Sequence, residues 1–170
     1  MHFSMKNKDY IYSSLSSNDN IKGIIHICHG KGEHIGRYSW LTSMLNSDGY
    51  HVISMDHRGH GRWVKNNHEK GIFAKINGWE VITEDLKNLI VDTNQKYPNL
   101  DQYLLAHSMG SWVGLNLIMN NTNIKGLIIS GSSKFPRSLI LAQKFLINIS
   151  IFFKGEHAIN PILNYMTCLL

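Results

Sequence analysis

The chain has 170 residues, of which 43% are hydrophobic and 17% are charged, and its formal net charge is +5. This composition fits one globular domain and argues against an intrinsically disordered chain. Two cysteines are too few for a disulfide framework, and the polar N-terminus lacks the apolar segment of a signal peptide. We therefore expect a cytoplasmic protein.

Four apolar runs, each ending in glycine or serine, alternate with amphipathic segments along the chain. After an opening segment that weakly resembles a hairpin (residues 3–14), the runs occupy residues 21–30, 50–59, 101–110 and 124–133. Such runs are typical of strands buried on both faces. The segments between them, residues 38–47, 79–97 and 111–121, have the apolar spacing of helices. This order predicts an α/β fold with a mostly parallel sheet and crossover helices, whose ligands gather at the carboxyl ends of the strands.

A serine flanked by small residues stands at one of these strand-to-helix junctions. The sequence Ala106-His107-Ser108-Met109-Gly110 has the small-x-Ser-x-Gly pattern of a nucleophile elbow. The serine of an elbow sits in a strained turn, so the residues two before and two after it must be small for strand and helix to approach. The alternative is a tight turn with a capping serine.

Two backbone N–H groups are candidates for binding the oxyanion that forms when a serine attacks an acyl group. The first is the N–H of Met109, directly after the candidate nucleophile. The second is the N–H of Lys31, in the loop His29-Gly30-Lys31-Gly32 that follows the first long strand. The alternative is a glycine-rich loop that only turns the chain.

Four sequence blocks in this order resemble the monoacylglycerol lipase and lysophospholipase branch of the α/β-hydrolases, which is also grouped with the serine aminopeptidases of the S33 type. The blocks are HGKGEHIGRY (29–38), MDHRGHG (55–61), GIFAKINGW with its ITEDL helix (71–86) and LLAHSMGS (104–111). The resemblance covers about residues 20–135. It implies the α/β-hydrolase fold and a serine ester hydrolase without a cofactor, which acts on acyl glycerides or lysophospholipids through an acyl-enzyme.

The resemblance also implies roles for individual residues. Ser108 would be the nucleophile, and Lys31 and Met109 would supply the oxyanion hole. Asp56, Arg58 and Gly59 match a loop-bracing motif, so Asp56 is not expected to be the catalytic acid. The supporting loops would contain His29, Gly30, Gly32, Asp56, Arg58 and Gly110.

The acid and the histidine of a catalytic triad have no clear counterparts in this sequence. In this fold they follow the serine in that order, but no aspartate follows Ser108, and Glu156 and His157 are neighbours that cannot be assigned these roles. We therefore predict a truncated N-terminal portion of such a hydrolase. Residues 1–135 would form the first part of the core and residues 136–170 the start of a cap, with the later strands missing. Whether this chain is itself an enzyme stays open, and the rival interpretation is a catalytically inactive remnant.

Other site types find little support in the sequence. The ten histidines show no spacing typical of a metal site. A nucleic-acid partner would rest on the net charge alone, because no basic stripe interleaved with aromatic residues is present. The expected partner is a small acyl ester or lysolipid. The longest apolar stretch, residues 139–153, is too short and too interrupted by polar residues to span a bilayer. We expect the amphipathic segment 136–153 to contact a membrane surface. The alternative is that this segment packs entirely against the body of the protein.

Overall fold

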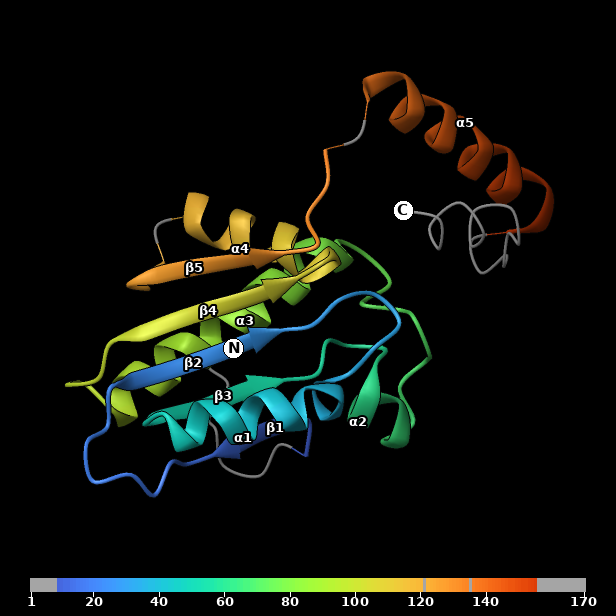
Figure 1. The fold of residues 1–170 in the computed structure, drawn as a ribbon. Coiled ribbons are helices and arrows are strands. Elements are labelled where there is room, and N and C mark those ends of the chain that lie inside the picture. Colours follow the sequence, from blue (N-terminus) through green and yellow to red (C-terminus); the bar gives the residue numbers. More distant parts are fainter. Residues whose placement is uncertain (1–8, 121, 135, 156–170) are drawn as a thin grey trace. The chain divides into compact units, whose positions relative to one another are not determined.

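The computed structural model describes residues 9–120, 122–134 and 136–155, and the chain divides into two units, residues 1–132 and 133–170. The first unit contains a five-stranded sheet in the order β1-β3-β2-β4-β5 (Figure 1). β1 runs antiparallel to β3, and the other neighbouring pairs are parallel. The strands are β1 (Ile11–Ser14), β2 (Gly23–Cys28), β3 (Tyr50–Met55), β4 (Gln102–His107) and β5 (Gly126–Ser130).

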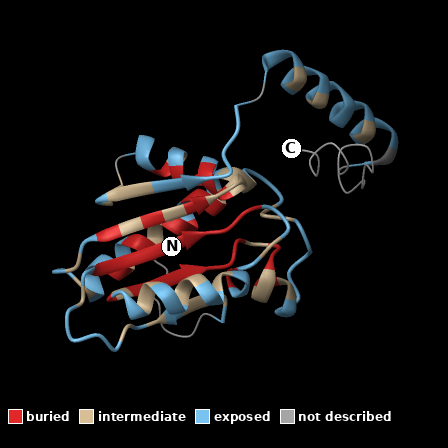
Figure 2. Ribbon diagram, viewed as in Figure 1, coloured by how far each residue is buried: buried red, intermediate tan, exposed pale blue. Residues whose placement is uncertain are grey.

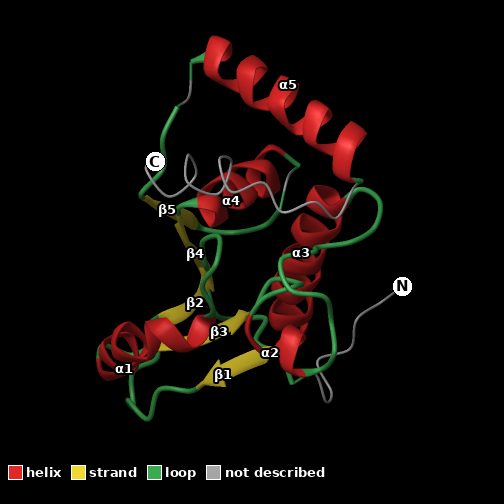
Figure 3. Ribbon diagram, turned by 90° about the vertical axis from the view of Figure 1, so that its right-hand side faces the viewer, coloured by secondary structure: helices red, strands yellow, loops and turns green. Residues whose placement is uncertain are grey.

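Helices cover both faces of this sheet. The helices of the first unit are η1 (Ile35–Tyr38), α1 (Ser39–Ser47), α2 (Gly61–Lys65), α3 (Gly78–Lys96) and α4 (Met109–Met119). α1 lies on one face, and α3 and α4 lie on the other (Figure 3). A mostly parallel sheet with crossover helices confirms the predicted fold class. The identity of the two units as part of a hydrolase core and the start of a cap stays a prediction.

The central strands contribute to two hydrophobic cores because successive residues of a strand point to opposite faces. On β2, Ile24 and Cys28 belong to the core shared with α3 and α4, whereas Ile25 and Ile27 belong to the core that packs against α1. All six residues of β2 are buried, and Figure 2 shows the same for most of β3. The carboxyl ends of β2, β3 and β4 are thereby fixed side by side, and the candidate site loops follow them.

The structure differs from the expectations at both edges of the sheet. Residues 3–8 of the expected hairpin lie outside the described residues, and β1 pairs with β3, where Ile11 faces Met55. The run that became β5 was expected to be buried on both faces, but Ile128 and Ile129 are 56% and 40% exposed. The reason is position, because β5 lies at the edge of the sheet and, among the described residues, pairs with β4 alone.

The second unit contains one described helix, α5 (Arg137–Lys154). It starts after Pro136 and ends at Gly155, whose φ of 81° is a left-handed conformation that favours glycine. Many of its apolar side chains are exposed, among them Leu141, Phe145, Phe152 and Phe153. Within the described part of the chain, no helix has the length and apolar character that a membrane crossing needs.

Candidate active site

Ser108 occupies a strained turn between β4 and α4. β4 ends at His107 and α4 begins at Met109, so a single residue connects them. Its φ of 51° and ψ of −121° are uncommon for a residue other than glycine. Two local hydrogen bonds fix this geometry: the N–H of Ser108 donates to the carbonyl of Ser130 at 2.8 Å, and the N–H of Ser111 donates to the carbonyl of Ser108 at 2.9 Å. Backbone strain held in this way is typical of functional sites.

The small residues around Ser108 allow helix and strands to approach closely. A Cβ atom on Gly110 would lie 2.3 Å from the carbonyl oxygen of Cys28 and 2.7 Å from that of His29. One turn further along α4, a Cβ atom on Gly114 would lie 3.2 Å from the Cβ of Ala106. The first turn of α4 therefore lies directly against the end of β2, and any side chain at position 110 would push the two apart.

The loop after β2 reaches Ser108. A Cβ atom on Gly30 would lie 3.0 Å from the Cβ of Ser108. A cleft of about 500 Å³ opens next to this contact, and both Lys31 and Met109 line it, together with apolar and basic side chains that include Val64, Lys70 and Phe73. The structure thus brings together the loop 29–32, the elbow and the start of α4, which are distant in the sequence.

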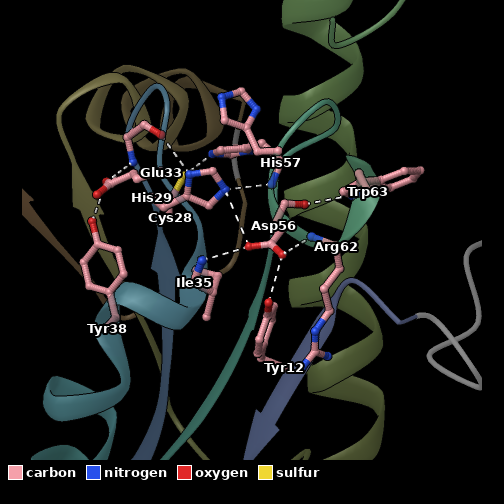
Figure 4. Close-up of polar contacts among 12 residues, drawn as sticks. Tyr12, Cys28, His29, Glu33, Ile35, Tyr38, Asp56, His57, Arg62 and Trp63 are labelled. Carbon is pink, nitrogen blue, oxygen red and sulfur yellow. Dashed lines mark hydrogen bonds and ion pairs between the residues drawn. The ribbon is translucent and has the colours of Figure 1, made fainter. Parts of the chain in front are cut away.

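Asp56 is fully buried, and both of its carboxylate oxygens accept hydrogen bonds (Figure 4). Oδ1 accepts the N–H of Ile35 at 2.8 Å, and Oδ2 accepts the hydroxyl of Tyr12 at 3.0 Å and the N–H of Arg62 at 2.9 Å. Burial and the neighbouring Asp56 raise the pKa of Tyr12 to about 12, so its hydroxyl stays a donor. One carboxylate thus connects β1, η1 and α2, which is the geometry of a brace.

Arg58 joins the loop after β3 to helix α3. Its Nε donates to Oδ2 of Asp85 at 2.6 Å, and its Nη2 donates to Oδ1 at 3.0 Å. This bidentate pair raises the pKa of Arg58 and connects a half-buried cation to a buried carboxylate. The sequence did not reveal Asp85 as the partner, although it stands in the ITEDL segment of the third block.

Three histidine rings lie next to one another behind the loop 29–32. The ring centroid of His29 is 4.4 Å from that of His57 and 5.5 Å from that of His60. The Nδ1–H of His29 donates to the carbonyl of Gly30 at 2.8 Å, and its Nε2 accepts the N–H of His57 at 2.9 Å. Burial lowers the pKa of His29 and lowers that of His57 well below its ordinary value. Among the described residues, no three His, Cys, Asp or Glu side chains are grouped to hold a metal ion.

Glu33 is a residue of the site that the sequence did not single out. Its Oε1 accepts the N–H of Gly30 at 2.5 Å and the hydroxyl of Tyr38 at 2.7 Å (Figure 4). Burial acts to raise its pKa, but the hydrogen bonds from Tyr38 and Gly30 outweigh burial, so the pKa lies below its ordinary value and Glu33 is ionised. The spacing of the two residues could have identified Glu33 from the sequence. A carboxylate three residues after a loop residue can reach back and accept the backbone N–H of that residue.

Comparison with known proteins decides the family. The family model described as serine aminopeptidase, S33, matches residues 19–155. The chain belongs to the serine aminopeptidase S33 family. It is 34% identical over 130 residues to the monoglyceride lipase homolog of Monkeypox virus, with 74% of this chain and 45% of that protein covered. It is 37% identical over 133 residues to the monoglyceride lipase of Mus musculus, with 74% and 42% covered.

A solved structure agrees with the fold. A highly thermostable carboxyl esterase from Bacillus coagulans, crystallised with glycerol, superposes with a TM-score of 0.77 at 25% identity, and the match covers 92% of this chain and 49% of that chain. These findings confirm an α/β-hydrolase of the monoglyceride lipase type. The matched region amounts to less than half the length of each of these three relatives.

Proposed function

We propose that this chain carries the nucleophile and the oxyanion hole of a serine ester hydrolase of the monoacylglycerol lipase or lysophospholipase type. The observation that carries the proposal is the strained turn at Ser108, which lies against Gly30 at the edge of a cleft lined by Lys31 and Met109. The similar proteins are named monoglyceride lipases, and an acyl ester of glycerol or a lysolipid is therefore the proposed substrate.

The proposed chemistry follows from this geometry. The Oγ of Ser108 attacks the ester carbonyl carbon, and the carbonyl oxygen becomes an oxyanion that accepts hydrogen bonds from the N–H groups of Lys31 and Met109. The C–O bond to the alcohol then breaks, the alcohol leaves with the proton of the serine, and an acyl-enzyme remains. Water hydrolyses this ester, which releases the fatty acid and regenerates Ser108.

A second candidate is a chain that keeps the fold and the serine but does not turn over substrate. It applies to these 170 residues taken by themselves, among which no aspartate follows Ser108, and Glu156 and His157 lie outside the described residues. Without a positioned imidazole the hydroxyl stays a poor nucleophile. In a studied triad enzyme, the oxyanion hole and substrate binding alone accelerate the reaction about 10³- to 10⁴-fold over the rate in water. We expect the 170-residue chain alone to turn over p-nitrophenyl esters more slowly than about 1 per second.

Acylation in the presence of free imidazole tests the nucleophile. Imidazole in solution supplies a general base, so p-nitrophenyl butyrate is expected to leave a butyryl group on Ser108, which peptide mass mapping locates. Ser108→Ala is expected to remove the adduct, while Ser43→Ala, on the exposed side of α1, retains it. Acylation spread evenly over several serines, or an adduct that survives in Ser108→Ala, would contradict the assignment.

Helix α5 is the proposed contact with a lipid surface. Its exposed Leu141, Phe145 and Phe152 supply apolar area, and Arg137 and Lys144 supply positive charge that favours anionic lipids. We expect the chain to float with anionic vesicles at low salt, and Phe145→Ser with Phe152→Ser to reduce the bound fraction several-fold. Chain that stays with the soluble fraction at low salt would instead support a helix packed against the protein.

A further inference from the structure

The N–H groups on either side of Lys31 are both held by side chains. The N–H of Gly30 donates to Oε1 of Glu33 at 2.5 Å, and the N–H of Gly32 donates to Nε2 of His60 at 3.1 Å. The N–H of Lys31 belongs to the peptide group between these two. The orientation of that peptide is therefore determined at both of its ends.

The two acceptors come from different parts of the fold. Glu33 lies in the same loop and is itself fixed by the hydroxyl of Tyr38 at 2.7 Å, with Nη1 of Arg37 at 3.5 Å from its other oxygen. His60 lies in the loop after β3, so its bond to Gly32 joins two loops that are separated by 28 positions in the sequence. The glycine before Lys31 is therefore held by a residue of its own loop, and the glycine after it is held by a residue of the loop that follows β3.

His60 is oriented to accept rather than to donate at Nε2. Its Nδ1–H donates to the carbonyl of Arg58 at 3.0 Å, which leaves the lone pair of Nε2 for the N–H of Gly32. The buried ring stacks on Phe73, with the ring centroids 5.8 Å apart and the planes at 25°. The ring therefore has a fixed plane and a fixed tautomer in front of the loop.

Glycine makes these restraints necessary. Gly32 has a φ of 74°, and a Cβ atom there would meet nothing within 4 Å, so side-chain packing does not hold this residue. Glycine also loses more conformational entropy on ordering than any other residue, so the two glycines around Lys31 make the loop costly to order. Hydrogen bonds from the flanking peptides fix the loop, together with the bond from the Nδ1–H of His29 to the carbonyl of Gly30.

We propose that Glu33 and His60 are positioning residues that hold the peptide N–H of Lys31 in the oxyanion hole. Neither touches the reacting atoms, and each acts through the neighbouring glycine. The catalytic consequence rests on the proposed function, whereas the restraint on the loop is a property of the folded chain and is measured separately.

Amide hydrogen exchange at neutral pH, followed by NMR on the full 170-residue chain, tests the restraint. His60→Leu removes the acceptor, so the amide of Gly32 is expected to exchange about tenfold faster. His60→Gln keeps an acceptor oxygen and is expected to restore most of the protection. Glu33→Ala likewise removes the acceptor of the Gly30 N–H and is expected to speed exchange at Gly30, whereas Glu33→Gln keeps an acceptor oxygen and is expected to restore most of the protection. His51→Leu is the matched control, because His51 accepts the N–H of Ser16 at 3.0 Å at the beginning of β3, at the other end of the sheet.

Imidazole-assisted acylation of Ser108 supplies the second measurement. His60→Leu is expected to lower the maximal acylation rate about 10²-fold, the typical effect of losing one oxyanion donor, with little change in the half-saturating ester concentration. His60→Gln is expected to recover most of that rate. The proposal would be overturned if amide exchange at Gly32 were unchanged in His60→Leu. It would also be overturned if His60→Leu and His60→Gln lowered the acylation rate equally. If the parent chain is not acylated at Ser108, the proposed function fails, and the exchange rates still decide whether the loop is held in this way.

Discussion

Gly110→Ala is expected to destabilise the fold by more than about 4 kcal/mol, a large part of the total stability of a domain of this size. The added methyl would lie 2.3 Å from the carbonyl oxygen of Cys28 and 2.7 Å from that of His29, both of which are backbone atoms. Neither atom can turn away like the end of a flexible side chain, because Cys28 is paired with Ala106 in the centre of the sheet. Helix α4 would have to move off the sheet, and the buried Val113 and Leu117 would move with it.

Urea unfolding followed by circular dichroism measures this effect. Gly71→Ala is the matched control, because Gly71 has a φ of 79° and a Cβ atom there would meet nothing within 4 Å. The left-handed conformation should cost this variant about 1 to 2 kcal/mol. A Gly110→Ala protein as stable as the Gly71→Ala protein would show that α4 does not pack against β2 as described.

The features that sequence predicted are those encoded in short segments. The elbow is a local pattern, because a nucleophilic Ser108 with the small residues Ala106 and Gly110 on either side lies within five positions. The apolar runs and the amphipathic segments between them also predict strands and helices without any long-range information. α4 nevertheless begins at Met109, two residues before the predicted start, because apolar periodicity does not report the turn that precedes it.

The features that sequence missed are tertiary contacts. Nothing in the neighbourhood of Arg58 points to Asp85, and nothing near Gly32 points to His60, because these partners meet only when the loops are folded. The pairing of β1 with β3 and the exposure of β5 also depend on the order of strands in the sheet rather than on their composition. Asp56 was predicted only in part. The resemblance indicated that it stabilises the loops, but its three hydrogen-bond donors were identified only in the structure.

Acidification below about pH 6.5 is expected to destabilise the folded chain well before its carboxylates are protonated. Burial lowers the pKa of His26, His29 and His57 from the ordinary value of 6.5. Above that value both states are neutral at these positions, and the full stability is present. Below it, the unfolded chain binds protons that the folded chain does not, so the free energy of unfolding decreases as the pH falls.

The size of the effect follows from the number of these groups. Each histidine that stays neutral in the fold lowers the stability by up to about 1.4 kcal/mol per pH unit, so three lower it by up to about 4 kcal/mol per unit, against a typical total of about 5 to 15 kcal/mol. Glu33, whose pKa is lowered in the fold, adds a further loss only below its ordinary value of 4.5. The histidines therefore account for the loss between pH 6.5 and pH 5.

Urea unfolding at pH 7.5, 6.5 and 5.5 tests this prediction in the parent chain and in His57→Gln. Glutamine does not titrate, so the variant should be less stable at pH 7.5, where packing around the buried ring is lost, but its stability should fall less steeply with acidification. The difference between the two slopes should grow from near zero at pH 7.5 toward one proton at pH 5.5, because the unfolded His57 takes up its proton around its ordinary pKa of 6.5, whereas burial holds the pKa of the folded ring well below that value. Equal slopes would mean that His57 takes up its proton in the folded chain, and a stability that stays constant down to pH 5.5 would mean that none of the three rings is buried in its neutral form.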